Sequence, residues 1–272
     1  DAMTVKPTPP AIPFKAPDSF FQDGTEIFKD LMRIDTTNPP GDEKVAMDYA
    51  EKRLQEVGIS SERFVSPGGR HSLMAHLGPN DENALILSAH LDVVPVDLAH
   101  WDHPPFEAVE ADGCIYGRGA IDMKNMAAYA LASIRELARS EAPLQRGLRV
   151  LLFADEETGC SEGSLAIARQ QPSWLKGSVA VTEVGGFTTY VDHHRIYPIQ
   201  VAEKGFVWFK LHIEGTPGHG SMPSGEGAVD ELARIVELLK AQPFDFRCTQ
   251  PAKDFLEGIA GVLGFPRGTV FK

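Results

Sequence analysis

An imidazole and several carboxylates stand directly after short apolar segments of this sequence. His90 and Asp92 follow one such segment, the acidic triplet at 155–157 follows a second, and Glu183 ends a third. Asp122 comes at the end of a glycine-rich turn. Imidazole and carboxylate groups suit zinc, manganese or cobalt, and one shared carboxylate can bridge two such ions about 3.5–4 Å apart. The set therefore favours a hydrolytic site built around two divalent metal ions.

Each of these residues also allows an interpretation without a metal ion. Residues two apart in an extended chain point to the same side, so Asp92 can brace the ring of His90, yet this spacing alone is also common in structural positions. Asp122 can instead cap the helix that follows it. The triplet at 155–157 can form a solvated acidic loop. Because an unpaired carboxylate at the end of an apolar strand is costly, Glu183 favours a ligand or an ion pair.

Three segments are predicted to form the strands that position these groups. Residues 83–90, 147–154 and 178–183 carry compact apolar runs, which are typical of strands buried on both faces of a mainly parallel sheet. Helical stretches at 123–140 and about 161–170 alternate with them. The order predicts an α/β fold. Since ligands of such sheets collect at the carboxyl ends of the strands, we expect the site there.

Two further helices are predicted before the first strand. Apolar residues between positions 20 and 34 recur at helical spacing, with Asp18 or Ser19 as the expected N-cap. A second helix over about 45–57 is followed by Gly58, which can adopt the left-handed conformation that often ends a helix.

Composition excludes several classes of protein. The 272 residues carry 26 Lys and Arg against 38 Asp and Glu, a formal net charge of −12, which argues against a nucleic-acid-binding surface. No stretch approaches about 18 consecutive apolar residues, so we expect no membrane-spanning helix and no membrane partner. The 3 cysteines lack the spacing of a thiolate zinc site or a disulfide framework. No glycine motif for nucleotide binding is present.

The beginning of the chain has its own pattern. The sequence starts at Asp1 rather than Met, and residues 6–13 are rich in proline, as in an extended polyproline leader. We expect that a segment has been removed upstream, and we favour a periplasmic or secreted mature form over a cytoplasmic one.

Five motifs, taken in order, resemble the signatures of the M20 metallopeptidases. That family includes aminoacylase-1, carboxypeptidase G2, succinyl-diaminopimelate desuccinylase and the carboxypeptidase S group. The motifs are HLD at 90–92, GRGAIDMK at 117–124, DEETG at 155–159, Glu183, and GHGS at 218–221. Two further segments, IDTTNPPG at 34–41 and WDHPPF at 101–106, are similar to the carboxypeptidase S branch.

The resemblance implies a set of metal ligands. Asp122 would bridge two divalent ions, His90 and Glu183 would complete the coordination of one ion, and Glu157 would serve the other. Asp92 would orient the ring of His90. The resemblance implies zinc as the metal, with cobalt or manganese as alternatives.

It also implies two catalytic side chains. Glu156 would act as the general base that takes a proton from the attacking water and passes it to the leaving amine. His219 would polarise the scissile carbonyl as an oxyanion donor. The implied reaction is hydrolysis of an amide bond next to a free carboxylate in an N-acyl amino acid or a short peptide.

The implied domain organisation has three parts. After the leader at 1–17, a metal-binding catalytic domain is expected over 18–203, and the start of an inserted α+β lid and dimerisation domain over 204–272. Within the lid we expect an alternating strand at 206–214 and an amphipathic helix over about 227–240. A homodimer is a further expectation.

The sequence also departs from the family pattern. Family members return from the lid to complete the sheet and to supply a last metal-ligand histidine, whereas no histidine follows His219 here. We therefore expect a C-terminally truncated chain. An alternative interpretation is a non-catalytic fragment that binds at most one metal ion and self-associates.

Overall fold

The computed structural model divides into two units, Asp1–Glu183 and Val184–Lys272. The division falls earlier than the predicted boundary after residue 203, and the assignment of 204–272 as a lid stays a prediction. Most of the predicted leader, residues 1–15, lies outside the described residues. The structure describes residues 16–79, 82–140, 143–183, 188–203 and, with short gaps, 205–264 and Gly268.

The first unit contains a five-stranded sheet with the order β1-β2-β6-β3-β7. β3 pairs in parallel with both β6 and β7, which confirms the three predicted strands. The antiparallel strands β1 and β2 were not predicted, and they extend the sheet beyond β6. The strands are β1 (Ser61–Val65), β2 (His71–Leu77), β3 (Leu85–His90), β6 (Leu148–Phe153) and β7 (Val179–Val181).

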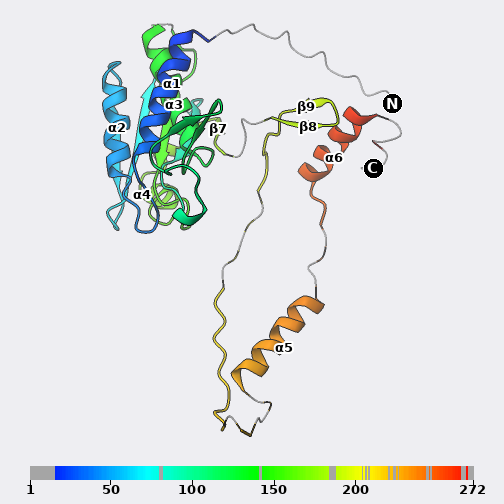
Figure 1. Ribbon diagram of the computed structural model, residues 1–272. Helices are drawn as coiled ribbons and strands as arrows, with labels where there is room; N and C mark the ends of the chain where they lie inside the picture. The colour runs from blue at the N-terminus through cyan, green and yellow to red at the C-terminus, as the bar shows by residue number, and fades with distance from the viewer. Residues whose placement is uncertain are drawn as a thin grey trace. The chain divides into compact units, whose positions relative to one another are not determined.

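Helices cover both faces of this sheet, which confirms the α/β class. α1 and α3 lie side by side (Figure 1), and α3 packs on β3 and β6 while α2 packs on β2. Successive side chains of β2 point to opposite faces of the sheet, so they belong to two parts of the core. Leu73 and Ala75 pack under α1, α2 and α3. Met74 packs on the opposite face with Ile167 and Trp174. The helices of the unit are α1 (Asp18–Arg33), α2 (Lys44–Gln55), α3 (Lys124–Ser140), α4 (Ser164–Gln170) and the short η2 (Pro172–Leu175).

The start of α1 differs from the prediction. Pro17 occupies the N-cap position with extended backbone angles, and Asp18 is already the first helical residue, so the expected cap at Asp18 or Ser19 is wrong. Proline restricts its own backbone and needs no hydrogen-bond partner for its nitrogen, so a helix can begin directly after it. The predicted glycine signal is confirmed, since Gly58 follows α2 with φ of +75°.

β7 is less buried than its apolar sequence suggests. Val179 and Val181 are 49% and 42% exposed, so the prediction of a strand buried on both faces is wrong for this element. β7 stands at the end of the described sheet and pairs with β3 alone. An edge strand has a neighbour on one side only, which leaves more of its side chains accessible.

The second unit contains a hairpin and two helices. β8 (Thr189–Val191) pairs with β9 (His194–Ile196). α5 (Ala228–Ala241) confirms the predicted amphipathic helix, and α6 (Gln250–Leu263) was not predicted. Of the strand predicted at 206–214, residues 206 and 208 lie outside the described part of the chain, and the other residues are not in a strand.

A small hairpin and a long connection complete the first unit between β3 and α3. β4 (Val109–Ala111) pairs with β5 (Cys114–Tyr116), and the short helix η1 (Leu98–His100) precedes them. None of the described helices combines the length and the apolar character that crossing a bilayer requires. The 3 cysteines are free.

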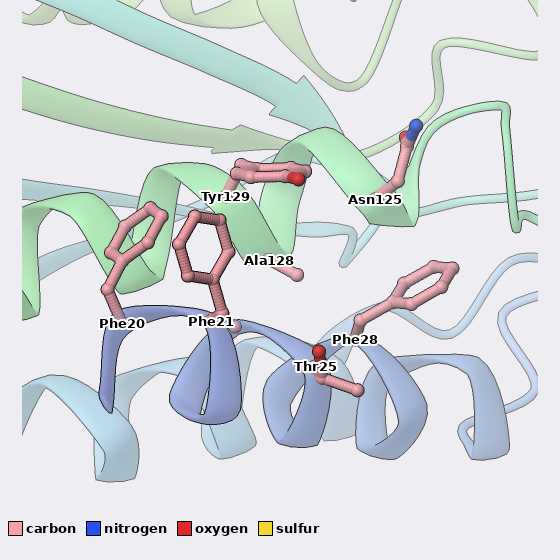
Figure 2. Close-up of a pocket in the computed structure, with 8 residues that line it drawn as sticks. Phe20, Phe21, Thr25, Phe28, Asn125, Ala128 and Tyr129 are labelled. Atoms are coloured by element: carbon pink, nitrogen blue, oxygen red, sulfur yellow. The ribbon is translucent and has the colours of Figure 1, made fainter. Parts of the chain in front are cut away.

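An aromatic pocket lies between α1 and α3. Phe20 packs edge-on against Phe21, with ring centroids 5.3 Å apart, and at a tilt against Tyr129 at 6.3 Å. Figure 2 shows these rings around the pocket, with Phe28 further along α1. None of the predicted site residues lines this pocket.

A buried charge cluster joins α1, α2 and α3, the helices on one face of the sheet. Asp23 of α1 is 9% exposed and accepts hydrogen bonds from Arg53 of α2 at 2.6 Å, and from Arg135 and Arg139 of α3 at 2.8 and 3.0 Å. Burial alone would raise the pKa of Asp23, but the hydrogen bonds from Arg135 and Arg139 outweigh it and lower this pKa to about 2. The ionised carboxylate therefore contributes to the packing of all three helices.

Replacing Asp23 with Asn is expected to reduce the free energy of unfolding by about 3–5 kcal/mol, because three buried or half-buried arginines lose their shared counter-ion. Since the pKa of Asp23 in the folded protein lies below the ordinary value of 3.8 for an aspartate, the stabilisation is complete above pH 3.8 and is lost as the pH falls toward about 2. Urea unfolding at neutral pH and at about pH 3 measures both effects.

The control is Glu26→Gln, which removes a charge paired with Arg53 from a side chain that is 61% exposed. We expect a change below about 1 kcal/mol, because exposed ion pairs contribute little. Equal losses in the two variants would contradict the role assigned to Asp23.

Candidate metal centre

Three predicted ligands meet at the carboxyl ends of neighbouring strands. His90 is the last residue of β3, Glu183 lies just beyond β7, and Asp122 lies just before α3. The ring nitrogen Nε2 of His90 is 3.0 Å from Asp122 Oδ1 and 3.6 Å from Glu183 Oε2. Each residue offers one ligand atom within 4.8 Å of the others, and all three belong to the first unit. The geometry matches what the alternation of strands and helices predicts.

The glycine-rich turn before Asp122 packs too closely for other residues. A Cβ on Gly119, whose φ is +81°, would lie 2.8 Å from Cγ1 of Val93, and one on Gly117 would lie 2.9 Å from the carbonyl oxygen of Pro105. A glycine at each point lets the turn approach the segment that follows β3. The turn therefore holds Asp122 beside His90.

Lys124 fixes the other side of this turn. Its side chain is fully buried, and its Nζ donates hydrogen bonds to the carbonyl oxygens of Leu31 at 3.0 Å and Ile34 at 2.7 Å, at the end of α1. Burial lowers the pKa of Lys124 to about 8. A cation at a helix C-terminus is favourable, because the last carbonyl groups carry partial negative charge. Sequence reasoning missed this residue.

Asp92 is fully buried and lies behind His90. The Nδ1 atom of His90 is 2.9 Å from the backbone oxygen of Asp92 and 3.4 Å from its Oδ1. The two carboxylate oxygens also accept hydrogen bonds from the backbone N–H groups of Glu156 and Glu157, each at 3.0 Å. A proton on Nδ1 leaves Nε2 free to face the cluster, which is the usual arrangement of a histidine ligand.

The acidic triplet divides into one structural residue and two that face the site. Asp155 is 3% exposed, with φ of +63°, and it accepts hydrogen bonds from Ser161 and from the backbone of Glu162. Glu156 places its Oε2 3.8 Å from Nε2 of His90, with 42% of its side chain exposed. The alternative of a solvated acidic loop therefore does not describe Asp155.

Glu157 shares a pocket with Asp122. The pocket is also lined by Val94 and by residues 117–121 of the glycine-rich turn. Glu157 does not belong to the three-residue group formed by His90 and its neighbours. Its assignment to a second metal ion stays a prediction.

His219 belongs to the second unit. Its Nδ1 lies 2.8 Å from the hydroxyl oxygen of Ser221. The neighbouring Gly220 of the predicted motif lies outside the described residues. The expected contact of His219 with a substrate carbonyl stays a prediction.

Negative charge dominates the electrostatics of the cluster. Burial alone would lower the pKa of His90, but its hydrogen bonds to the carboxylates of Asp92 and Glu183 raise it to about 11. The hydrogen bond from His90 in turn lowers the pKa of Glu183, although burial opposes it. The carboxylates around His90 therefore stabilise a positive charge at this position.

Unlike the pKa of Glu183, the pKa values of Glu156 and Glu157 are raised. Burial is the main reason that the pKa of Glu157 rises to about 7, and the negative charge of Asp122 adds to it. Burial also raises the pKa of Glu156, against the opposing effect of His90, and the carboxylates around it contribute. A carboxylate with a raised pKa is suited to accept a proton near neutral pH.

The donor set fits a divalent cation. An imidazole nitrogen and two carboxylate oxygens converge from separate elements, and the ligand ring has a carboxylate behind it, as metal-binding histidines usually do. A cation at this position would replace the proton that the surrounding charge draws to His90. Hard oxygen donors with one imidazole suit zinc, manganese or cobalt.

Comparison with known proteins gives consistent results. The family model described as peptidase family M20/M25/M40 matches residues 86–261. Aminoacylase-1 of Sus scrofa is 31% identical over 219 residues, which cover 79% of this chain and 53% of the relative. N-fatty-acyl-amino acid synthase/hydrolase PM20D1 of Xenopus tropicalis is 29% identical over 254 residues, or 89% of this chain and 50% of the relative.

A solved structure has the same fold. The M20 family metallo-carboxypeptidase Sso-CP2 from Sulfolobus solfataricus aligns over 59% of this chain and 37% of its own, with a TM-score of 0.54 and 21% identity. The chain spans about half the length of the curated relatives it matches. The family match covers well over half of the chain and includes the elements that carry His90, Asp122 and Glu183. The chain therefore belongs to the peptidase family M20/M25/M40.

Proposed function

We propose that this chain carries the metal-binding part of an amide hydrolase. The substrate class is an N-acyl amino acid or a short peptide with a free carboxylate next to the scissile amide. The observation that carries the proposal is the convergence of His90, Asp122 and Glu183 within 4.8 Å at one edge of the sheet. The names of the aminoacylase and of the fatty-acyl-amino acid hydrolase among its relatives support the substrate class.

The donor set supports one ion, and the resemblance to the family implies a second. His90, Asp122 and Glu183 would hold the first divalent ion. The resemblance implies that Glu157 would serve the second ion together with Asp122, and that the metal is zinc, with cobalt or manganese as alternatives. A bound divalent ion lowers the pKa of a water molecule toward about 7 and polarises a carbonyl oxygen.

The chain's own residues then move the proton. Glu156 has a raised pKa and lies beside the cluster without belonging to it. It accepts a proton from the attacking water and returns this proton to the nitrogen of the leaving amine, so that the amide C–N bond breaks. The remaining proton of the water also passes to the amine, so the products are a carboxylate and an ammonium group. The resemblance to the family implies that His219, in the second unit, would donate to the carbonyl oxygen as negative charge develops there.

Asp92 prepares two parts of this site at once. Its contact with His90 sets the direction of the ring, and its bonds to the backbone of Glu156 and Glu157 place the loop that carries the proton acceptor. Because these contacts exist before substrate arrives, the groups need little rearrangement during the reaction.

A second candidate is a non-catalytic form that binds one metal ion and self-associates. One observation favours it. Among the residues that the structure describes, the side chains with metal-ligand spacing form one group of three, which is enough to hold one ion.

Removal of the metal is expected to abolish hydrolysis. Dialysis against a chelator should reduce the turnover of N-acyl amino acids to background, and added zinc, cobalt or manganese should restore it, because the water is too weak an acid without the ion. Release of the free amino acid measures the rate. Turnover that persists in the chelated protein would contradict the proposal.

Glu156→Gln is expected to lower kcat about 100- to 10,000-fold, because the amide cannot accept the proton. Metal content should not change, since Glu156 is not one of the three clustered ligands. Elemental analysis and single-turnover kinetics on the same sample measure both quantities.

The matched control is Glu107→Gln, at an exposed glutamate of the same unit. It should turn over at the wild-type rate. Loss of activity in both variants, or loss of metal from Glu156→Gln, would argue against the role of a proton acceptor.

Metal stoichiometry separates the two candidates. The proposed hydrolase binds two divalent ions per chain after loading and removal of free metal, whereas the alternative binds one or none. Elemental analysis together with the intact mass gives the ratio. One ion combined with no turnover would favour the non-catalytic form, and concentration-dependent sedimentation would then show its self-association.

A further inference from the structure

A buried polar side chain that the proposed mechanism does not use lies directly behind Asp92. Asn38 is 3% exposed, and its Nδ2 donates a hydrogen bond to Asp92 Oδ2 at 2.8 Å. The same nitrogen lies 3.0 Å from the hydroxyl oxygen of Thr158 and 3.4 Å from Asp155 Oδ1. Its Oδ1 accepts a hydrogen bond from Arg70 at 3.4 Å. One amide therefore contacts two buried carboxylates and one guanidinium.

We propose that Asn38 is a positioning residue of the metal centre: its side-chain amide holds the carboxylate of Asp92 in the orientation that accepts the backbone N–H groups of the two glutamates and that lies 3.4 Å from Nδ1 of His90. The inference deepens the proposed function and rests on it for the role of the cluster. The contacts themselves are properties of the folded chain.

The backbone around Asn38 explains why its side chain reaches Asp92. Residues 36–38 run alongside the segment that follows β3, with a parallel bridge between Thr37 and Val93. The N–H group of Asn38 donates to the carbonyl oxygen of Val93 at 2.8 Å, and Val93 donates to the carbonyl oxygen of Thr36 at 3.2 Å. The hydroxyl of Thr36 donates to the carbonyl oxygen of Leu91 at 2.5 Å. The segment is therefore held in register up to Asn38.

Position 38 requires a neutral side chain that donates a hydrogen bond. Asp92 and Asp155 are both buried and acidic, and both lie within hydrogen-bonding distance of the same nitrogen of Asn38. A carboxylate at position 38 would place a third negative charge between them, whereas an apolar residue would leave Asp92 Oδ2 without one of its donors.

Arg70 supports the amide from the far side. It pairs with Glu43, which is 1% exposed, through its Nε at 2.7 Å, and it also contacts Asp155 at 3.4 Å. The buried groups therefore form a connected series from Glu43 through Arg70 and Asn38 to Asp92 and then to His90. Since each member is hydrogen-bonded, the series specifies one arrangement of the site.

The test compares Asn38→Asp, which keeps the shape and removes the donor, with Asn38→Ser, which stays neutral but is too short to reach Asp92. We expect both variants to weaken zinc binding about 10- to 100-fold in competition with a chelator, as for other groups that support a ligand. In the metal-free protein, the nitrogen NMR signals of the His90 ring should shift in both variants. The matched control is Ser161→Ala, which removes a 3.2 Å bond to Asp155 and leaves Asp92 untouched, so zinc affinity should stay within about 3-fold.

Several outcomes decide the proposal. Wild-type zinc affinity and unchanged ring signals of His90 in the two Asn38 variants would overturn it, and so would an equal loss in Ser161→Ala. If both Asn38 variants fail to fold, hydrogen exchange of the side-chain amide of Asn38 in the wild-type protein decides: slow exchange supports the bond to Asp92, and exchange at the rate of an exposed amide overturns it. A wild-type chain that hydrolyses nothing, with shifted ring signals in the variants, would reject the proposed function and keep the positioning role.

Discussion

A carboxylate that is fully removed from water needs hydrogen-bond donors on all sides, and that requirement at Asp92 organises the site. Its hydrogen-bond donors come from the side chain of Asn38 and from the backbone of the loop after β6, and the ring of His90 lies 3.4 Å from it. Satisfying one buried charge therefore brings together the segment after α1, the end of β3 and the end of β6. The cluster of ligands lies immediately in front of this junction.

Charge is balanced differently in the two buried regions of the first unit. Around Asp23 a single carboxylate meets three arginines, and its pKa falls because cations surround it. Around His90 a single imidazole meets several carboxylates, and its pKa rises because anions surround it. The first arrangement is complete with the residues of the chain alone. In the second, the described residues around His90 carry more negative than positive charge, which distinguishes a place for a cation from a structural ion-pair cluster.

The sequence predicted the parts of the structure that depend on neighbouring residues. The apolar runs before His90, Asp155 and Glu183 predicted the parallel strands, and parallel strands bring their carboxyl ends to one edge, so the cluster followed. Contacts between distant residues were not predictable in the same way. Asn38 and Asp92 are 54 positions apart, and Lys124 and Leu31 are 93 apart, and no periodicity in one segment reports on the other. The polar sequence pattern at 34–41 was the one sign in the sequence that Asn38 has a role, and it did not identify Asp92 as the residue that Asn38 contacts.

The two strands that lead to His90 and Glu183 are paired differently in the described sheet. His90 continues from a strand that is paired on both sides, whereas Glu183 follows the edge strand, which in the described sheet has β3 as its single neighbour. Edge elements open locally at lower free energy than central ones. Within the described sheet, an ion held by both residues would connect a strand that is paired on both sides with one that is paired on one side, so that part of its binding energy would be spent on ordering β7. Tighter binding of the ion and a better ordered β7 would therefore occur together.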